Sequence, residues 1–405
     1  MQVEDRSVME KYNFDELVDR KNTNSLKYDF AVKRGYPADV LPLWVADMDF
    51  RTAPCITERL KKEAEFGIFG YSDTQSKYFN IVSGWFSKHF GLQLKEQWLV
   101  KTPGIVFAIA MAIRAFTDEG DGVLIQQPVY YPYSDAIRDN GRKLVNSPLQ
   151  RKDGHYEIDF EDFETKIAEN GVKLFLLCSP HNPVGRVWTL EELHRIAEIC
   201  KRHQVLILED QIFCDFTYKG YTQHMLFGMD EEIREQMILC TAPSKTFNIT
   251  GLQTSNIFIA NDRLRRKFIH TISQTGYSQL NQMGLAACEA AYTGGEEWLM
   301  QLREYLEGNL QFVREFLKKE LPEITLIEPE GTFLIWLDFE KLGLTEQERQ
   351  EMILYYARLW LDSGAVFGKS GEGFERINIA CPRATLKQAF KQLKEGITAY
   401  MKEKK

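Results

Sequence analysis

The sequence predicts an α/β fold in which a mainly parallel sheet between layers of helices forms a large domain, with a smaller α+β domain beside it. Three observations carry this prediction. Short apolar runs alternate with helical patterns through the centre of the chain. A strand–helix–strand unit with clear boundaries lies among them. Beyond about residue 291, longer helices with few strands replace the alternation.

Buried strands are expected where short apolar runs lie between turn residues. In chain order these runs are Trp98–Lys101, Gly122–Gln126, Lys173–Cys178, Val205–Glu209, Met237–Cys240 and Ser255–Ala260. Continuous apolar composition is typical of strands that are covered on both faces. The runs therefore predict a central sheet that helices sandwich.

The clearest helix of this region follows Lys173–Cys178 and precedes Val205–Glu209. Thr189 and Glu192 have the spacing of a capping box, in which each side chain accepts a hydrogen bond from the other residue's backbone. Apolar residues then recur at helical spacing, at positions 193, 196, 197 and 200. Strand, helix and strand in this order form a βαβ unit, which makes the sheet mainly parallel.

The C-terminal third predicts the smaller domain. Thr332–Phe339 and Arg376–Ala380 have strand patterns, and the last helix carries an apolar packing stripe at positions 386, 390, 393, 397 and 400. The N-terminal stretch up to about residue 45 has few strong elements and is expected to pack on the same domain. The expected division is a large domain of residues 46–290 and a small domain of residues 1–45 and 291–405.

Composition excludes several functional classes. The 405 residues include 50 Lys and Arg against 58 Asp and Glu, a formal charge of −8 that argues against general nucleic-acid binding. No apolar run approaches the roughly 20 residues that a membrane span needs, and Met1–Arg6 lacks the apolar core of a signal peptide. Seven scattered cysteines without a CxxC pair indicate a reduced, cytoplasmic location without disulfides or a zinc site.

Five of the predicted strands are each followed closely by a residue that can bind or react. These residues are Gly104, Tyr130, Asn182, Asp210 and Lys245. Each alone has an ordinary explanation, as a turn glycine, a half-buried aromatic, a turn, a helix cap and a surface lysine. Together they indicate a site, because ligands bind beyond the carboxyl ends of the strands in an open parallel sheet. We expect these five residues to face one crevice.

The same residues match what pyridoxal 5′-phosphate (PLP) requires. Its aldehyde needs a lysine amine for a Schiff base, which Lys245 supplies. Its pyridine nitrogen needs a carboxylate, which Asp210 supplies. Its phosphate needs a helix N-terminus, expected after Gly104, and Tyr130 offers an aromatic surface for the ring.

On these grounds the sequence resembles the fold-type I PLP enzymes of the aspartate aminotransferase superfamily over nearly its whole length. The motifs that carry the resemblance are Asn182-Pro183-x-Gly185, Asp210, Ser244-Lys245 and Arg376-Ile377-Asn378-Ile379-Ala380-Cys381-Pro382-Arg383. A closer similarity is to the cystathionine β-lyase-like carbon–sulfur lyase branch, the MalY/PatB type. That similarity rests on Leu41–Phe50, Phe69–Ser72 and Ser244–Leu252.

The resemblance implies a role for each residue around the PLP ring. Lys245 would form the Schiff base and move the proton, and Asp210 would pair with the pyridine nitrogen. Asn182 would hydrogen-bond the ring hydroxyl, and Tyr130 would stack on the ring.

The resemblance also implies how the phosphate is held. Backbone N–H groups of Gly104, Ile105 and Val106 would bind it with help from Ser244. Tyr71 would reach the phosphate of the neighbouring subunit, so a homodimer with shared active sites is expected.

For the substrate, the resemblance implies that Arg383 binds the α-carboxylate as a bidentate fork. Trp44 and Ala46, in the segment Leu41–Phe50, are expected to contact the substrate. An exposed ion pair is the alternative explanation for Arg383.

Two positions depart from the resembled pattern. Phe213 stands three residues after Asp210, where the superfamily often has Tyr and the lyase branch often His, and Phe cannot hydrogen-bond the ring hydroxyl. Gln253 stands eight residues after Lys245, where many aminotransferases carry a phosphate-binding Arg. His181 could be a base, but a packing role is favoured because Lys245 already supplies proton transfer.

The expected activity is PLP-dependent β-elimination from cystathionine or a cysteine S-conjugate, a sulfur amino acid, with release of a thiol, pyruvate and ammonia. Phe213 and the apolar segment around Trp44 favour this over the alternative, an aminotransferase that acts on an amino acid and a 2-keto acid. A PLP-fold regulatory or binding protein is a third possibility. The intact set of Lys245, Asp210 and Arg383 argues against it.

Overall fold

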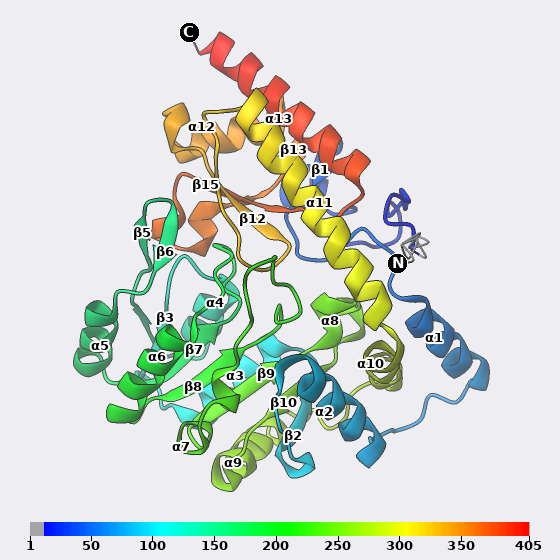
Figure 1. The fold of residues 1–405 in the computed structure, drawn as a ribbon, viewed down its shortest axis with the longest axis vertical. Coiled ribbons are helices and arrows are strands. Elements are labelled where there is room, and N and C mark those ends of the chain that lie inside the picture. The colour runs from blue at the N-terminus through cyan, green and yellow to red at the C-terminus, as the bar shows by residue number, and fades with distance from the viewer. Residues whose placement is uncertain (1–11, 405) are drawn as a thin grey trace, which may run out of the picture.

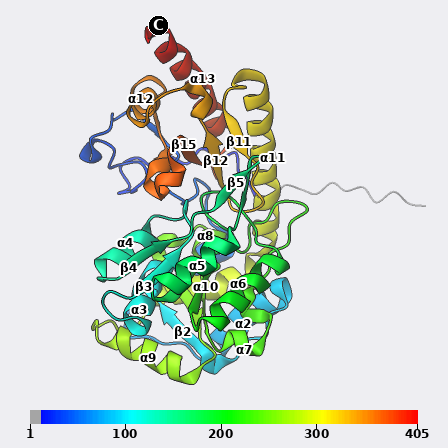
Figure 2. The same ribbon diagram turned by 90° about the vertical axis from the view of Figure 1, so that its left-hand side faces the viewer.

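The computed structural model describes residues 12–404, so the segment Met1–Arg6 lies outside the described residues. Two sheets lie one above the other in Figure 1, and helix α11 (Glu296–Glu320) runs alongside both of them. Figure 2 shows the same two parts from the side. Among residues 12–404, no helix is long and apolar enough to cross a membrane.

The larger sheet has seven strands, and all of the predicted runs contribute to it. Their order is β2 (Leu99–Thr102), β10 (Ser255–Phe258), β9 (Met237–Thr241), β8 (Leu206–Asp210), β7 (Val172–Cys178), β3 (Gly122–Ile125) and β4 (Lys143–Asn146). Pairs from β9 to β4 are parallel, whereas β10 is antiparallel to both of its neighbours. The prediction missed β4, an edge strand whose first residue, Lys143, is exposed and which therefore lacks a continuous apolar run.

Helices cover both faces of this sheet, as predicted. Side chains of successive strand residues point to opposite faces, so Leu174 and Leu176 join one core cluster while Phe175 and Leu177 join the other. The first cluster includes α3 (Ile105–Phe116), α4 (Pro132–Asp139) and α9 (Asp262–Ser273). The second includes α2 (Ser76–Phe90), α5 (Phe160–Glu169), α6 (Leu190–Arg202) and α10 (Gln282–Gly294).

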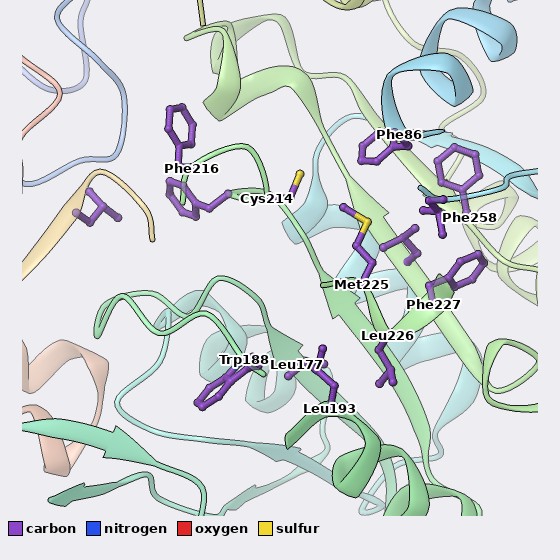
Figure 3. Packing of buried hydrophobic residues seen from close by; sticks show 14 of the residues in the cluster. Phe86, Leu177, Trp188, Leu193, Cys214, Phe216, Met225, Leu226, Phe227 and Phe258 are labelled. Atoms are coloured by element: carbon purple, nitrogen blue, oxygen red, sulfur yellow. The ribbon is translucent and has the colours of Figure 1, made fainter. Parts of the chain in front are cut away.

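Figure 3 shows part of the second cluster, with Leu177 of β7 and Leu193 of α6 lying together. The predicted capping box begins α6. Thr189 Oγ1 accepts a hydrogen bond of 3.1 Å from the Glu192 N–H, and Glu192 Oε2 accepts one of 2.8 Å from the Thr189 N–H. The βαβ unit β7–α6–β8 is therefore present as expected.

The smaller sheet is antiparallel, in the order β11 (Thr325–Ile327), β12 (Leu334–Asp338), β15 (Phe374–Asn378) and β14 (Asp362–Ser363). Helices α11 and α13 (Arg383–Glu403) pack on it in one core cluster. Strand β1 (Leu41–Pro42) pairs with β13 (Leu359–Trp360). This pairing supports grouping the N-terminal segment with the C-terminal third, and the boundaries at residues 45 and 290 stay a prediction.

The remaining elements connect these layers. They are α1 (Pro54–Phe66), β5 (Gln150–Lys152), β6 (His155–Glu157), α7 (Glu231–Arg234), α8 (Pro243–Thr246), α12 (Glu346–Glu351) and a π-helical turn, Met352–Tyr356.

The segment 44–50 is tied both to strand β15 of the smaller sheet and to the loop that follows α8. Asn378 of β15 donates hydrogen bonds of 2.8 Å and 2.7 Å to the carbonyls of Val45 and Asp47. Asn248, from the loop after α8, donates to the carbonyls of Met48 at 3.0 Å and Phe50 at 2.9 Å. Backbone groups outside regular structure need partners when they are buried, and here the two amide side chains supply them.

Candidate active site

A cavity of about 300 Å³ opens at the carboxyl edge of the larger sheet. The five residues that the sequence placed after successive strands all line it: Gly104, Tyr130, Asn182, Asp210 and Lys245. Ala46, Ile105, Val106 and Ser244 line it too. The expected crevice is therefore present, and nine of the twelve residues predicted for the site border it.

Lys245 lies on the short helix α8, which follows β9. Its Nζ donates a hydrogen bond of 2.8 Å to the Ala46 carbonyl. Burial lowers the pKa of Lys245 to about 8, although the nearby carboxylate of Asp47 opposes this shift. A lysine with a lowered pKa holds part of its amine in the neutral, nucleophilic form near pH 7.

The turn that carries Lys245 is fixed by a buried carboxylate. Thr246 Oγ1 donates a hydrogen bond of 2.6 Å to Asp215 Oδ2, and the Trp85 indole donates one of 3.1 Å to Asp215 Oδ1. Asp215 comes from the segment after β8 and Trp85 from α2. The position of the Lys245 backbone therefore depends on residues that do not line the pocket.

Asp210 ends β8 and is fully enclosed. Burial raises its pKa to about 6, and two hydrogen bonds oppose that shift. Tyr133 donates its hydroxyl to Asp210 Oδ2 at 2.6 Å, and the Ile212 N–H donates to Oδ1 at 3.0 Å. The carboxylate therefore stays largely ionised at neutral pH.

Tyr133 is a site residue that the sequence reasoning missed. It is fully buried on α4, lines the pocket and packs edge-on against Tyr130, with ring centroids 5.9 Å apart. Its nearness in sequence to Tyr130, which lies just before α4, was the available signal. Its contact with Asp210, across 77 residues of sequence, had no local signal.

Arg376 also lines the pocket and is buried. Its Nη1 donates to Asn182 Oδ1 at 3.0 Å, and its Nη2 donates to the Trp44 carbonyl at 2.7 Å and pairs with the Asp362 carboxylate. The Nε–H of Arg376 has no hydrogen-bond partner among residues 12–404. A buried donor without a partner, held rigidly at the pocket wall, suits the carboxylate of a ligand.

The placement predicted for Arg383 is wrong. Its Nε donates to Asn309 Oδ1 at 2.5 Å, and its guanidinium lies over the rings of Tyr305 and Phe312, outside the pocket. The physical reason is that Arg383 begins α13, which packs beside α11, whereas Arg376 lies on strand β15 and faces the pocket.

One further expectation is corrected by the geometry. The Trp44 ring stacks on Trp360, with centroids 4.5 Å apart, in a separate apolar cluster, so that only the Trp44 carbonyl reaches Arg376. The Trp44 ring owes its position to packing on Trp360 that sequence spacing does not encode. Tyr71 is 97% exposed, in the loop between α1 and α2, and does not line the pocket of its own chain. Its expected reach into the neighbouring subunit's site stays a prediction.

The phosphate end predicted at Gly104 has the required backbone. Gly104 precedes α3 with a φ of 152°, which favours glycine. The first N–H groups of α3 lack intrahelical partners. Ser244, Thr250 and Gln253 add hydroxyl and amide donors to the same cavity. Gln253 borders the cavity at the position where many aminotransferases carry a phosphate-binding Arg, so this residue offers a neutral donor there.

These groups together fit PLP. A lysine amine, a buried carboxylate, an aromatic ring and a helix N-terminus border one cavity, and the free Arg376 Nε–H adds a place for an amino-acid carboxylate. Phe213 borders the cavity without any hydrogen-bonding atom, and it packs on Phe333.

His181 lies outside the cavity lining. It is fully buried, its Nε2 lies 2.9 Å from the Pro128 carbonyl, and burial lowers its pKa to about 4. A neutral histidine in van der Waals contact with Trp188 fits the favoured packing role.

Known proteins resemble this chain throughout its length. The family model for aminotransferase class I and II matches residues 38–393. The chain is 40% identical to cystathionine β-lyase PatB of Bacillus subtilis (strain 168), over 95% of this chain and 100% of that protein. It is 32% identical to protein MalY of Escherichia coli (strain K12), over 96% of this chain and 99% of that protein.

Solved structures agree. Cystalysin from Treponema denticola, which contains PLP, matches with a TM-score of 0.93 and 36% identity, over 97% of this chain and 100% of that one. The PLP-bound C–S lyase from Staphylococcus hominis matches with a TM-score of 0.88 and 32% identity, over 95% and 98%. The chain therefore belongs to the aminotransferase class I and II family and has the fold of the fold-type I PLP enzymes.

Proposed function

We propose that this protein is a PLP-dependent carbon–sulfur β-lyase that cleaves cystathionine or cysteine S-conjugates into a thiol, pyruvate and ammonia. The observation that carries the proposal is the convergence of Lys245, Asp210 and the unpartnered Arg376 Nε–H in one buried pocket. The relatives named as cystathionine β-lyases support the choice of reaction.

When bound, PLP supplies an electron sink for the negative charge left on the substrate α-carbon. Lys245 would hold the aldehyde carbon and would remove the α-proton with its neutral amine. Asp210 would hold the proton of the pyridine nitrogen, and Tyr130 would cover the ring. The first turn of α3 and Ser244 would bind the phosphate, with neutral donors from Gln253 and Thr250.

Arg376 would orient the substrate through its carboxylate. Asn182, Asp362 and the Trp44 carbonyl fix the guanidinium before any ligand binds, so little ordering remains to be done at binding. With the carboxylate and the α-amine both fixed, the Cα–H and Cβ–S bonds can be held perpendicular to the ring. A thiolate leaves readily, so this alignment is the main requirement for β-elimination.

We also infer a homodimer with shared active sites. Tyr71, Phe69, Ile68 and Phe66 are all largely exposed in and beside the loop between α1 and α2. A contiguous exposed apolar patch is typical of an interaction surface, and a two-fold dimer is the commonest closed assembly. Tyr71 would then reach the phosphate end of the partner's pocket.

We also infer that the protein is located in the cytoplasm. All seven cysteines are free and six of them are buried, which suits a reducing environment. Fractionation of the source cells, with detection by antibody, would check this.

The reaction itself is tested by product analysis. With L-cystathionine and no added keto acid, the holoenzyme should release pyruvate and ammonia. Lys245→Ala should lower turnover at least about 10³-fold, because both the anchor and the base are lost. Borohydride reduction and peptide mapping should place the cofactor on Lys245. Lys101→Ala is the matched control, since Lys101 pairs with Asp73 outside the pocket. Amino transfer to a keto acid without pyruvate release would contradict the lyase assignment.

Arg376 and Arg383 give a paired test of carboxylate binding. Arg376→Lys should lower kcat/KM about 100-fold, mostly through KM, because a lysine cannot reproduce the anchored fork. Arg383→Lys should change kcat/KM less than about threefold, because only a surface-side packing contact changes. Steady-state kinetics of pyruvate release would decide, and the reverse ranking would restore the role expected for Arg383 from its sequence motif.

Tyr133 is expected to set the acid limb of the pH profile. Its hydrogen bond lowers the pKa of Asp210, so Tyr133→Phe should raise that pKa and move the acid limb of kcat/KM upward by about one pH unit. The pH dependence of the cofactor absorbance should move in the same direction. Tyr78→Phe is the control, because the Tyr78 hydroxyl is equally buried but donates to Asn256 at 2.7 Å, outside the pocket. Equal profiles for the two variants would exclude this role.

Tyr71 tests the shared site. Tyr71→Phe should weaken PLP retention about tenfold in equilibrium dialysis, since one hydrogen bond to a phosphate dianion is lost, while the melting temperature stays unchanged. Tyr221→Phe, another exposed tyrosine, should have no effect on retention. A fully active monomer in sedimentation velocity would refute the dimer.

A further inference from the structure

We infer that a second cavity, which adjoins the active-site pocket at Lys245, receives the sulfur substituent of the substrate, and that it accepts neutral or cationic substituents and disfavours anionic ones. The inference rests on the proposed lyase function, because in that reaction the substituent on the substrate β-carbon is a sulfur group that leaves next to Lys245.

The second cavity has a volume of about 570 Å³. It shares Val45, Lys245, Thr250 and Gln253 with the active-site pocket. The active-site pocket, at about 300 Å³, is bordered by the groups that fit PLP and an amino-acid head. A bulky sulfur substituent therefore has to extend beyond it, and the larger adjoining cavity begins at the lysine that acts on the α-carbon.

Part of the wall of this second cavity, which we call the chamber, is apolar. Val18, Leu26, Met48 and Phe50 border it. Such a wall suits the alkyl or aryl part of a thiol, because burying apolar surface stabilises a complex by roughly 25 cal/mol per Å².

The arginines of the chamber are already paired. Arg20 contacts Asp47 Oδ2 at 2.5 Å and Asp49 Oδ1 at 2.7 Å. Arg51 contacts Glu16 at 2.9 Å. Neither guanidinium is therefore free to bind a carboxylate without losing an ion pair.

The hydrogen-bonding atom of the chamber wall that lacks a partner is instead an oxygen of a carboxylate. Asp47 Oδ1 is buried and has no hydrogen-bond partner among residues 12–404, although Lys27 Nζ lies 3.9 Å from it and Arg20 binds the other oxygen, Oδ2. Asp47 borders the chamber together with Lys245. A neutral amide or an ammonium group on the substituent could donate to this oxygen, whereas a carboxylate would lie beside a like charge in a partly enclosed space.

Two isosteric substrates isolate the charge. S-(carbamoylmethyl)-L-cysteine and S-(carboxymethyl)-L-cysteine differ only by an amide in place of a carboxylate. With the holoenzyme, the neutral conjugate should give a kcat/KM for pyruvate release at least about tenfold higher than the anionic one, because a like charge within reach of Asp47 weakens binding. Equal values, or a preference for the anionic conjugate, would overturn the inference and leave the lyase function intact.

Variants assign the effect to Asp47. Asp47→Asn should reduce the preference between the two conjugates to about threefold or less, and Asp47→Glu should keep it. Asp73→Asn, an exposed acid paired with Lys101 outside the chamber, should leave the preference unchanged. An unaltered preference in a folded Asp47→Asn variant would overturn the role of this residue.

An inhibition measurement tests the same charge preference without cleavage of the probe and without any variant. L-Glutamine should inhibit the holoenzyme at least about tenfold more strongly than L-glutamate, since the two have the same shape and differ in side-chain charge. The reverse order would overturn the chamber assignment. Absence of pyruvate from both cysteine conjugates would remove the lyase function, and the inference with it.

Discussion

The burial of the Lys245 amine at the carboxyl edge of the larger sheet is the constraint on which the rest of the site depends. An ammonium ion is costly in apolar surroundings, and no carboxylate of residues 12–404 lies within ion-pair distance of Nζ. The Ala46 carbonyl at 2.8 Å is its hydrogen-bond partner. The amine is therefore easily neutralised, and the Thr246–Asp215 hydrogen bond holds the turn that carries it.

The segment 44–50 owes its course to the same arrangement. Its carbonyls are bound by Arg376, Asn378, Lys245 and Asn248, which come from β15 of the smaller sheet, from α8 and from the loop after α8. Two of these partners are the groups proposed to handle substrate. Binding of a cofactor at the amine would release the Ala46 carbonyl, so ligand binding and the position of this segment share hydrogen bonds.

The charged groups of the pocket are each held by a hydrogen-bond or ion-pair partner within the fold. Tyr133 and the Ile212 N–H hold Asp210, and Asp362 holds Arg376. This pattern leaves one face of each charged group open to a ligand while limiting the cost of its burial. Phe213 borders the cavity without a hydrogen-bonding atom, whereas Tyr133 supplies its hydroxyl to Asp210.

The sequence by itself determined the strands of the larger sheet, apart from the edge strand β4, and the residues that follow them. Local patterns suffice there, because a buried parallel strand needs an apolar run and its carboxyl end fixes where the next residue lies. Tertiary structure decided between Arg376 and Arg383, seven residues apart, since a strand side chain and the first residue of α13 face different layers. Only the tertiary structure brings Tyr133 into contact with Asp210 and places the Trp44 ring against Trp360, outside the pocket. Those contacts join segments distant in sequence, and only the packing of the layers determines which side chains meet.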